Sequence, residues 1–240
     1  MEPRPEVPPP PAPSGRWTRA QVVYAVALFI SAWTLVGIAL ASGDTWPRSA
    51  TELASAAFFF AYGLFTISIG YQHPNLGYYS FDRVSQVASI LVLGPVPAAL
   101  INGLASFVYP WHRLWKGVPL HRVAGAALNN SGLMATIVLA AGWAYSAIGG
   151  PVPLTSLTGL SIPALLVLVL GMQVLNDAGM LALYALGRRN LTGFFHGFSY
   201  ALELGAGATA VLVALIYNTM GLEVFLLTLV VLSLGMLALR

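Results

Sequence analysis

The sequence predicts an all-α fold: a polytopic bundle of transmembrane helices with seven to eight helical segments. Of the 240 residues, 58% are hydrophobic and only 8% are charged, and the chain has no cysteine. A soluble domain carries about 25% charged residues, whereas long apolar stretches are typical of membrane spans. The composition therefore excludes an ordinary soluble enzyme, a nucleic-acid-binding module and a disulfide-stapled secreted domain. It predicts the lipid bilayer as a partner and no nucleic acid.

The N-terminal residues 1–18 are predicted to form a disordered, proline-rich tail on the cytoplasmic side. Seven prolines lie within residues 1–15, which contain almost no apolar side chains to bury. Such a segment cannot form a packed core. Residues 19–240 are expected to form a single transmembrane helical domain.

Apolar segments that alternate with polar or glycine- and proline-rich stretches predict the spans. The predicted segments are about 20–42, 52–70, 79–109, 121–147, 161–187, 194–218 and 221–239. Residues 71–77, YQHPNLG, are interpreted as a turn-rich loop between two of them. The uncharged residues 149–160, GGPVPLTSLTGL, are typical of a loop on the outer face.

The segment 79–109 contains a predicted break at Gly94-Pro95-Val96-Pro97. Proline removes a backbone donor and clashes with the preceding turn, so two prolines after a glycine interrupt a helix. Each resulting piece is shorter than the roughly 20 residues that a bilayer requires. We therefore expect a short hairpin that returns to its starting side, with eight helical segments in total. The alternative is a single crossing, with seven.

The distribution of basic residues favours the hairpin. If 79–109 doubles back, ten of the eleven Lys and Arg residues lie on one side of the membrane and only Arg48 lies on the other. Cytoplasmic loops carry an excess of Lys and Arg. The sequence thus predicts that both termini are cytoplasmic.

Polar residues inside the spans are the candidate site. Gln173, Asn176 and Asp177 are spaced three and four residues apart, as are His196, Ser199 and Glu203, so each set shares a helical face. An ionisable side chain at mid-bilayer costs roughly 2.5–3.5 kcal/mol on insertion scales. The alternative for the amides is hydrogen bonding between helices alone. The predicted polar pocket for a ligand consists of Asp177, Asn176, Gln173, Glu203, Ser199, Asn129, Asn130 and Asn102.

No motif for chemistry accompanies these residues. Asp177 is the only aspartate well inside a predicted span, and the segment 197–200, GFSY, lacks the second glycine of a serine-protease turn. There is no glycine-rich phosphate loop and no pattern of zinc ligands. The sequence therefore predicts no enzyme, no catalytic residue, no metal and no cofactor.

Three segments resemble a known family. Residues 90–103, ILVLGPVPAALING, resemble a pattern found in the multi-span N-terminal input domains of bacterial signalling proteins. Residues 126–130, AALNN, and 174–186, VLNDAGMLALYAL, resemble later spans of the same domains. The resemblance covers about 80–240.

This resemblance implies a sensor domain in the bacterial inner membrane that recognises a small or lipidic ligand, or a membrane state. Such domains precede GGDEF, HD-GYP or histidine-kinase output domains, so the resemblance also implies a cytoplasmic domain after Arg240, cyclic-di-GMP signalling and a homodimer. The same hairpin resembles the substrate-capture subunits of energy-coupling-factor vitamin transporters. A small-molecule uptake subunit is therefore the alternative function.

Overall fold

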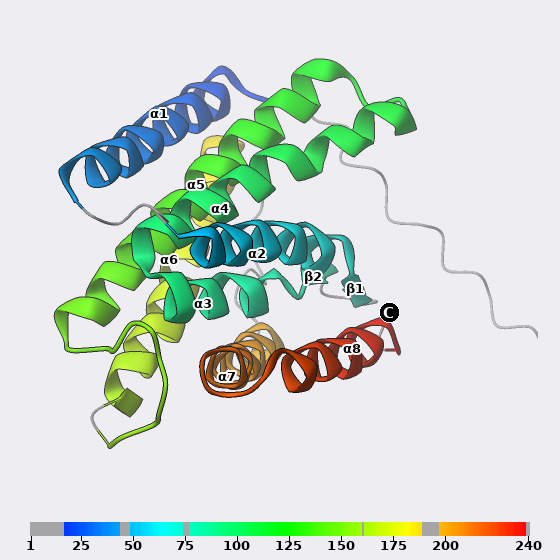
Figure 1. Ribbon diagram of the computed structural model, residues 1–240. Helices are drawn as coiled ribbons and strands as arrows, with labels where there is room; N and C mark the ends of the chain where they lie inside the picture. The colour runs from blue at the N-terminus through cyan, green and yellow to red at the C-terminus, as the bar shows by residue number, and fades with distance from the viewer. Residues whose placement is uncertain (1–16, 44–48, 74–76, 160, 189–196, 239–240) are drawn as a thin grey trace, which may run out of the picture.

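A computed structural model of the chain describes residues 17–43, 49–73, 77–159, 161–188 and 197–238. Within this part, eight α-helices, one 3-10 helix and one two-stranded hairpin follow one another (Figure 1). The first elements are α1 (Arg19–Ser42), α2 (Ala50–Ser68), β1 (Gly70–His73), β2 (Gly77–Ser80), α3 (Asp82–Leu93) and α4 (Pro95–Val108). They are followed by η1 (Tyr109–Lys116), α5 (Leu120–Ala147), α6 (Ser161–Leu186), α7 (Gly197–Thr219) and α8 (Leu222–Ala238).

The predicted all-α bundle is confirmed, and the helix bounds lie within a few residues of the predicted spans. The tail 1–18 falls outside the described residues except for Trp17 and Thr18. Thr18 accepts a hydrogen bond from the backbone N–H of Gln21 and so caps the start of α1.

One local prediction is wrong. The segment expected to be a turn-rich loop contributes to a small antiparallel hairpin, in which β1 pairs with β2 from Gly70↔Ser80 to His73↔Gly77. Aromatic residues favour extended backbone, and tyrosines occur in both strands. The hairpin leads the chain from α2 into α3.

The predicted break between α3 and α4 is confirmed. Gly94 separates the two helices with φ of 90°, a left-handed conformation that glycine adopts without strain. The amide of Asn102 on α4 donates to the hydroxyl of Ser89 on α3 at 2.9 Å, which shows that the chain doubles back. At 12 and 14 residues, α3 and α4 are about 18 and 21 Å long, too short to span the hydrocarbon layer as straight rods.

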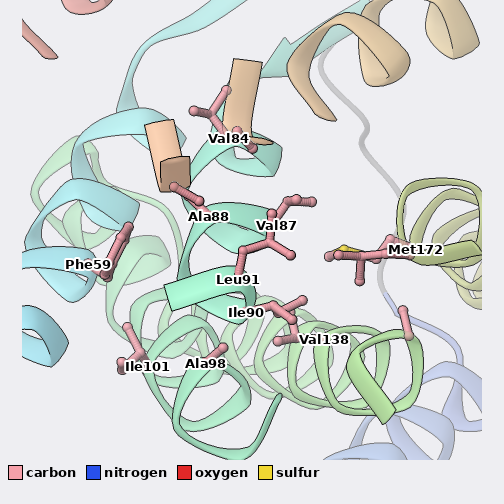
Figure 2. Packing of buried hydrophobic residues seen from close by; sticks show 14 of the residues in the cluster. Phe59, Val84, Val87, Ala88, Ile90, Leu91, Ala98, Ile101, Val138 and Met172 are labelled. Atoms are coloured by element: carbon pink, nitrogen blue, oxygen red, sulfur yellow. The ribbon is translucent and has the colours of Figure 1, made fainter. Parts of the chain in front are cut away.

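Helix α3 is the centre of the bundle. Every residue from Arg83 to Leu91 is buried, and α3 lies between α2 on one side and α7 on the other (Figure 1). Figure 2 shows apolar side chains of α3 surrounded by Phe59 of α2, Val138 of α5 and Met172 of α6. Polar side chains on such a helix must find partners inside the bundle, because an unpaired buried polar group is costly.

The outer surface is apolar, as expected of a membrane protein. Among the described residues, five helices are long and apolar enough to cross a membrane, and α8 is a shorter apolar helix. Large apolar side chains are exposed along α1 and α8, with Val23 at 61% and Leu227 at 65% of full exposure. Buried polar residues and an apolar exterior are the arrangement that a lipid solvent favours.

The basic residues gather at one end of the bundle, called the basic end here. The hydroxyl of Thr18 at the start of α1 donates to the carbonyl of Leu186 at the end of α6 at 3.1 Å, and Trp17 packs on Gly125 near the start of α5. Helix α3 begins at this end, and the last turns of α8 pack near it. The six Lys and Arg residues that the structure describes lie here: Arg19, Arg83, Arg113, Lys116, Arg122 and Arg188.

Candidate ligand-binding site

A polar cavity of about 380 Å³ opens at the basic end of the bundle. Its walls come from α3 to α7, η1, the end of α2 and the end of β2. The charged residues that line it are Asp82, Arg83, Arg113 and Glu203. The neutral polar residues that line it are Ser80, Ser106, Tyr109, Asn130, Gln173 and Asn176.

A buried ion pair forms one wall of this cavity. Nε of Arg83 donates to Oε2 of Glu203 at 2.6 Å, and the two side chains are only 5% and 19% exposed. Nη1 of Arg83 donates to Oε1 of Gln86 at 2.9 Å. Arginine keeps its charge in proteins, so Glu203 is the counter-ion that makes burial of this guanidinium tolerable.

The network continues to the start of α3. The amide of Gln86 donates to Oδ2 of Asp82 at 2.6 Å, and the hydroxyl of Ser80 donates to the other carboxylate oxygen of Asp82. A carboxylate in the first turn of a helix is favoured by the helix dipole. The β hairpin ends at Ser80 and so places that hydroxyl against the helix start.

Helix α6 supplies the opposite wall through Gln173 and Asn176. The amide of Gln173 donates to Oδ1 of Asp177 at 2.9 Å, and the hydroxyl of Tyr200 on α7 donates to Oδ2 of Asp177 at 2.7 Å. The Oε1 atom of Gln173 is buried and has no hydrogen-bond donor among the described residues. An unsatisfied buried acceptor of this kind calls for an explanation, and a bound molecule is one.

The structure brings four of the eight predicted site residues together in the cavity: Asn130, Gln173, Asn176 and Glu203. Three others do not line it, and the side chain of Ser199 lies outside the described residues.

Helix packing explains where those three point. The amide of Asn102 donates to the hydroxyl of Ser89 and to the carbonyl of Ala98, so Asn102 holds α4 against α3. Asn129 is buried beside Asn130, to which its amide donates at 3.4 Å. Asp177 faces α7 and is held by Gln173 and Tyr200.

The cationic residues of the cavity are not among the predicted site residues. Arg83 follows the turn-rich segment directly and lies within the predicted span 79–109. An arginine inside a predicted span is itself a signal of a buried partner. Arg113 lies on η1 and reaches the cavity only because the hairpin returns η1 to the start of α3. No local sequence pattern indicates that η1 lies beside the start of α3.

An apolar layer separates the cavity from the far end of the bundle. Ile90, Leu91, Val138 and Met172 are fully buried in it. The loop 149–159 packs against the end of α3 there, because the N–H of Leu154 donates to the carbonyl of Leu91 at 2.8 Å. These apolar residues do not line the cavity, whose charged side chains lie at the basic end.

The arrangement of groups is suited to holding a polar molecule. Two carboxylates and two guanidinium groups balance in formal charge, and neutral donors and acceptors lie between them. Among the described residues, no group of three or more His, Asp or Glu lies close enough together to hold a metal ion. Comparisons of the chain with protein-family models, with curated proteins and with solved structures found no match.

Proposed function

We propose that this chain is a membrane-embedded sensory module of a bacterial signal-transduction protein. A small polar ligand binds in the cavity at the basic end, and occupancy is transmitted through α7 and α8. The observation that carries the proposal is the Arg83–Glu203 pair, which lies in the cavity wall and joins the central helix α3 to α7. A ligand that contacts either residue alters the ion pair that joins α3 to α7.

In this proposal, the distribution of Lys and Arg determines how the bundle is oriented in the membrane. The basic end faces the cytoplasm of a bacterial inner membrane, because Lys and Arg are enriched on that side. The start of α1 and the end of α8 both lie at this end, as Met236 of α8 shares a groove with Phe81 at the start of α3. A helix displacement at α8 then emerges on the cytoplasmic side, where an output domain would receive it.

A small-molecule uptake subunit is the second candidate. The observation in its favour is the broken helix pair α3–α4 in the middle of the bundle, a device that transporters use at their substrate sites. Transport requires access to the cavity from both sides in turn. The buried apolar layer around Ile90 and Met172 closes one side, which favours recognition over transport.

Ligand binding is tested by thermal-shift screening of the purified chain against a library of small polar metabolites. We expect at least one compound to stabilise the wild type and to lose its effect in Asn176→Leu, which removes an amide from the cavity wall. Thr219→Val, an exposed residue at the other end of α7, is the matched control and keeps the effect. If no compound separates wild type from Asn176→Leu, the cavity is not a ligand site.

Relay is tested with spin labels, since the chain has no native cysteine. Cysteines introduced at His121 and Leu237, both exposed, report the distance between α5 and α8 at the basic end. We expect the ligand found in the screen to shift this distance by on the order of 2 Å or more. An unchanged distance, together with accumulation of the ligand inside proteoliposomes, would establish uptake in place of sensing.

A further inference from the structure

The cavity holds more hydrogen-bond donors than its own acceptors use. A guanidinium group has five N–H donors. Glu203 and Gln86 take two of those of Arg83, so three remain without a partner among the described residues. Arg83 is buried, at 4% exposure, and it lines the cavity, so a molecule bound there would lie next to its guanidinium.

A second guanidinium faces the same space. Arg113 of η1 is an exposed residue that lines the cavity, and no hydrogen bond or ion pair joins its side chain to another residue that the structure describes. Ser106 and Tyr109, which carry hydroxyl groups, also line the cavity. Two arginines and two hydroxyls form a donor-rich wall, and paired guanidinium groups bind carboxylate and phosphate oxygens well because their fork geometry matches them.

One residue that lines the cavity has a buried acceptor without a donor. Gln173 is 4% exposed, and its Oε1 has no partner within the part of the chain that the structure describes. Its N–H group is already held by Asp177 at 2.9 Å, which fixes the amide with Oε1 free. A molecule that satisfies Gln173 must offer an O–H or N–H group.

The size of the space limits the ligand. A volume of about 380 Å³ corresponds to on the order of ten water molecules at about 30 Å³ each. A compact molecule or a single headgroup fits, whereas a dinucleotide does not.

Building on the proposed function, we infer that the ligand is a small oxyanion, a carboxylate or phosphate that also carries an O–H or N–H donor. Its oxygens bind between Arg83 and Arg113, and its donor binds Oε1 of Gln173. The anion then lies close to Glu203, because both contact the same guanidinium. Repulsion between the two negative charges weakens the hold of Glu203 on Arg83 and thereby loosens α7 from α3.

This arrangement predicts opposite effects for two charge-neutralising substitutions. Arg113→Gln removes one charge-assisted contact and weakens anion binding by about ten-fold or more. Glu203→Gln removes the competing carboxylate and tightens anion binding by about three-fold or more. A merely structural role for Glu203 would make its loss weaken binding. The matched controls are Lys116→Gln on η1 and Glu223→Gln on α8, both exposed and outside the cavity, and each changes affinity by less than about two-fold.

The experiment uses the full chain in nanodiscs of zwitterionic lipid at constant ionic strength. Calorimetry compares inorganic phosphate and glycolate, which carry an oxyanion and an O–H donor, with glycerol, which is neutral. A second arm replaces part of the lipid with phosphatidylglycerol, in the absence of soluble anion. Saturable binding of phosphate or glycolate assigns a soluble ligand. Stabilisation by phosphatidylglycerol alone, lost in Arg113→Gln, assigns a lipid headgroup.

The inference is overturned if glycerol binds as tightly as glycolate, if no anion in either arm binds, or if Glu203→Gln and Arg113→Gln shift affinity in the same direction. The proposed function is tested separately, by the metabolite screen. If a neutral metabolite from the screen still stabilises the wild type but not Asn176→Leu, the cavity remains a ligand site and only the oxyanion assignment fails.

Discussion

The ion pair between Arg83 and Glu203 allows a quantitative test of how the bundle is held together. Arg83→Met removes the buried guanidinium and keeps a side chain of similar length. Glu203→Gln removes the carboxylate charge and keeps its shape. The double variant removes both charges at once, so the three proteins and the wild type form a double-mutant cycle.

The expected magnitudes follow from burial and distance. Removing one partner of a buried pair costs about 3–5 kcal/mol. We expect about 3 kcal/mol for each single variant, at the low end of this range, because Glu203 is 19% exposed and Asp82 lies near Arg83 through Gln86. The double variant leaves no uncompensated charge and is expected to cost less than either single variant, about 2 kcal/mol in total, which makes the coupling energy about 4 kcal/mol. Two unit charges about 4 Å apart at an effective dielectric constant of 20 interact by about 4 kcal/mol, which is consistent.

The assay is reversible unfolding of the purified chain in mixed micelles by titration with sodium dodecyl sulfate. The intrinsic fluorescence of the six tryptophans reports the transition. The control cycle uses Lys116→Gln and Glu223→Gln, two exposed charges, and each should change the free energy of unfolding by less than about 0.5 kcal/mol. Additive single effects at Arg83 and Glu203, with a coupling energy below about 0.5 kcal/mol, would refute the pairing that joins α3 to α7.

Three further predictions concern packing and the hairpin. Gly132→Ala places a methyl group 2.7 Å from the backbone nitrogen of Phe29, so α1 and α5 must separate and the melting temperature should fall by several degrees. Gly37→Ala is the control, because its methyl group meets open space and should leave the melting temperature unchanged. Equal melting temperatures for the two variants would contradict the close crossing of α1 and α5. Asn102→Ala removes the hydrogen bond to Ser89 Oγ and should cost about 1 kcal/mol in the same micelle titration, and an unchanged midpoint would show that the bond does not stabilise the hairpin. Asn218→Ala removes the amide that donates to the carbonyl of Leu154 at 2.8 Å. Hydrogen exchange in the loop 149–159 should therefore accelerate, while exchange in α5 stays the same. Protection of the loop equal to that of the wild type would show that Asn218 does not hold it in place.

The helical spans were predictable because their signals are local. Hydropathy over about 20 residues defines a span wherever the exterior is lipid, and the bounds of α1, α5 and α6 agree with the predicted segments within two residues. The break at Gly94 was predictable for the same reason, since glycine and proline act on their own backbone. The β hairpin was missed because each strand is only four residues long, and neither strand by itself indicates that it pairs with the other.

The sequence by itself determined that this protein is a helical membrane bundle with a helix break near Gly94 and polar residues inside its spans. Only the tertiary structure decided which of those residues meet. Asn102 and Gln173 are both buried amides in apolar helices, yet one ties the hairpin and the other lines the cavity. Arg83 and Glu203 are 120 positions apart, and their contact depends on α3 packing against α7. Periodicity assigns a residue to a face of its own helix, but which helix covers that face depends on the packing of the whole bundle.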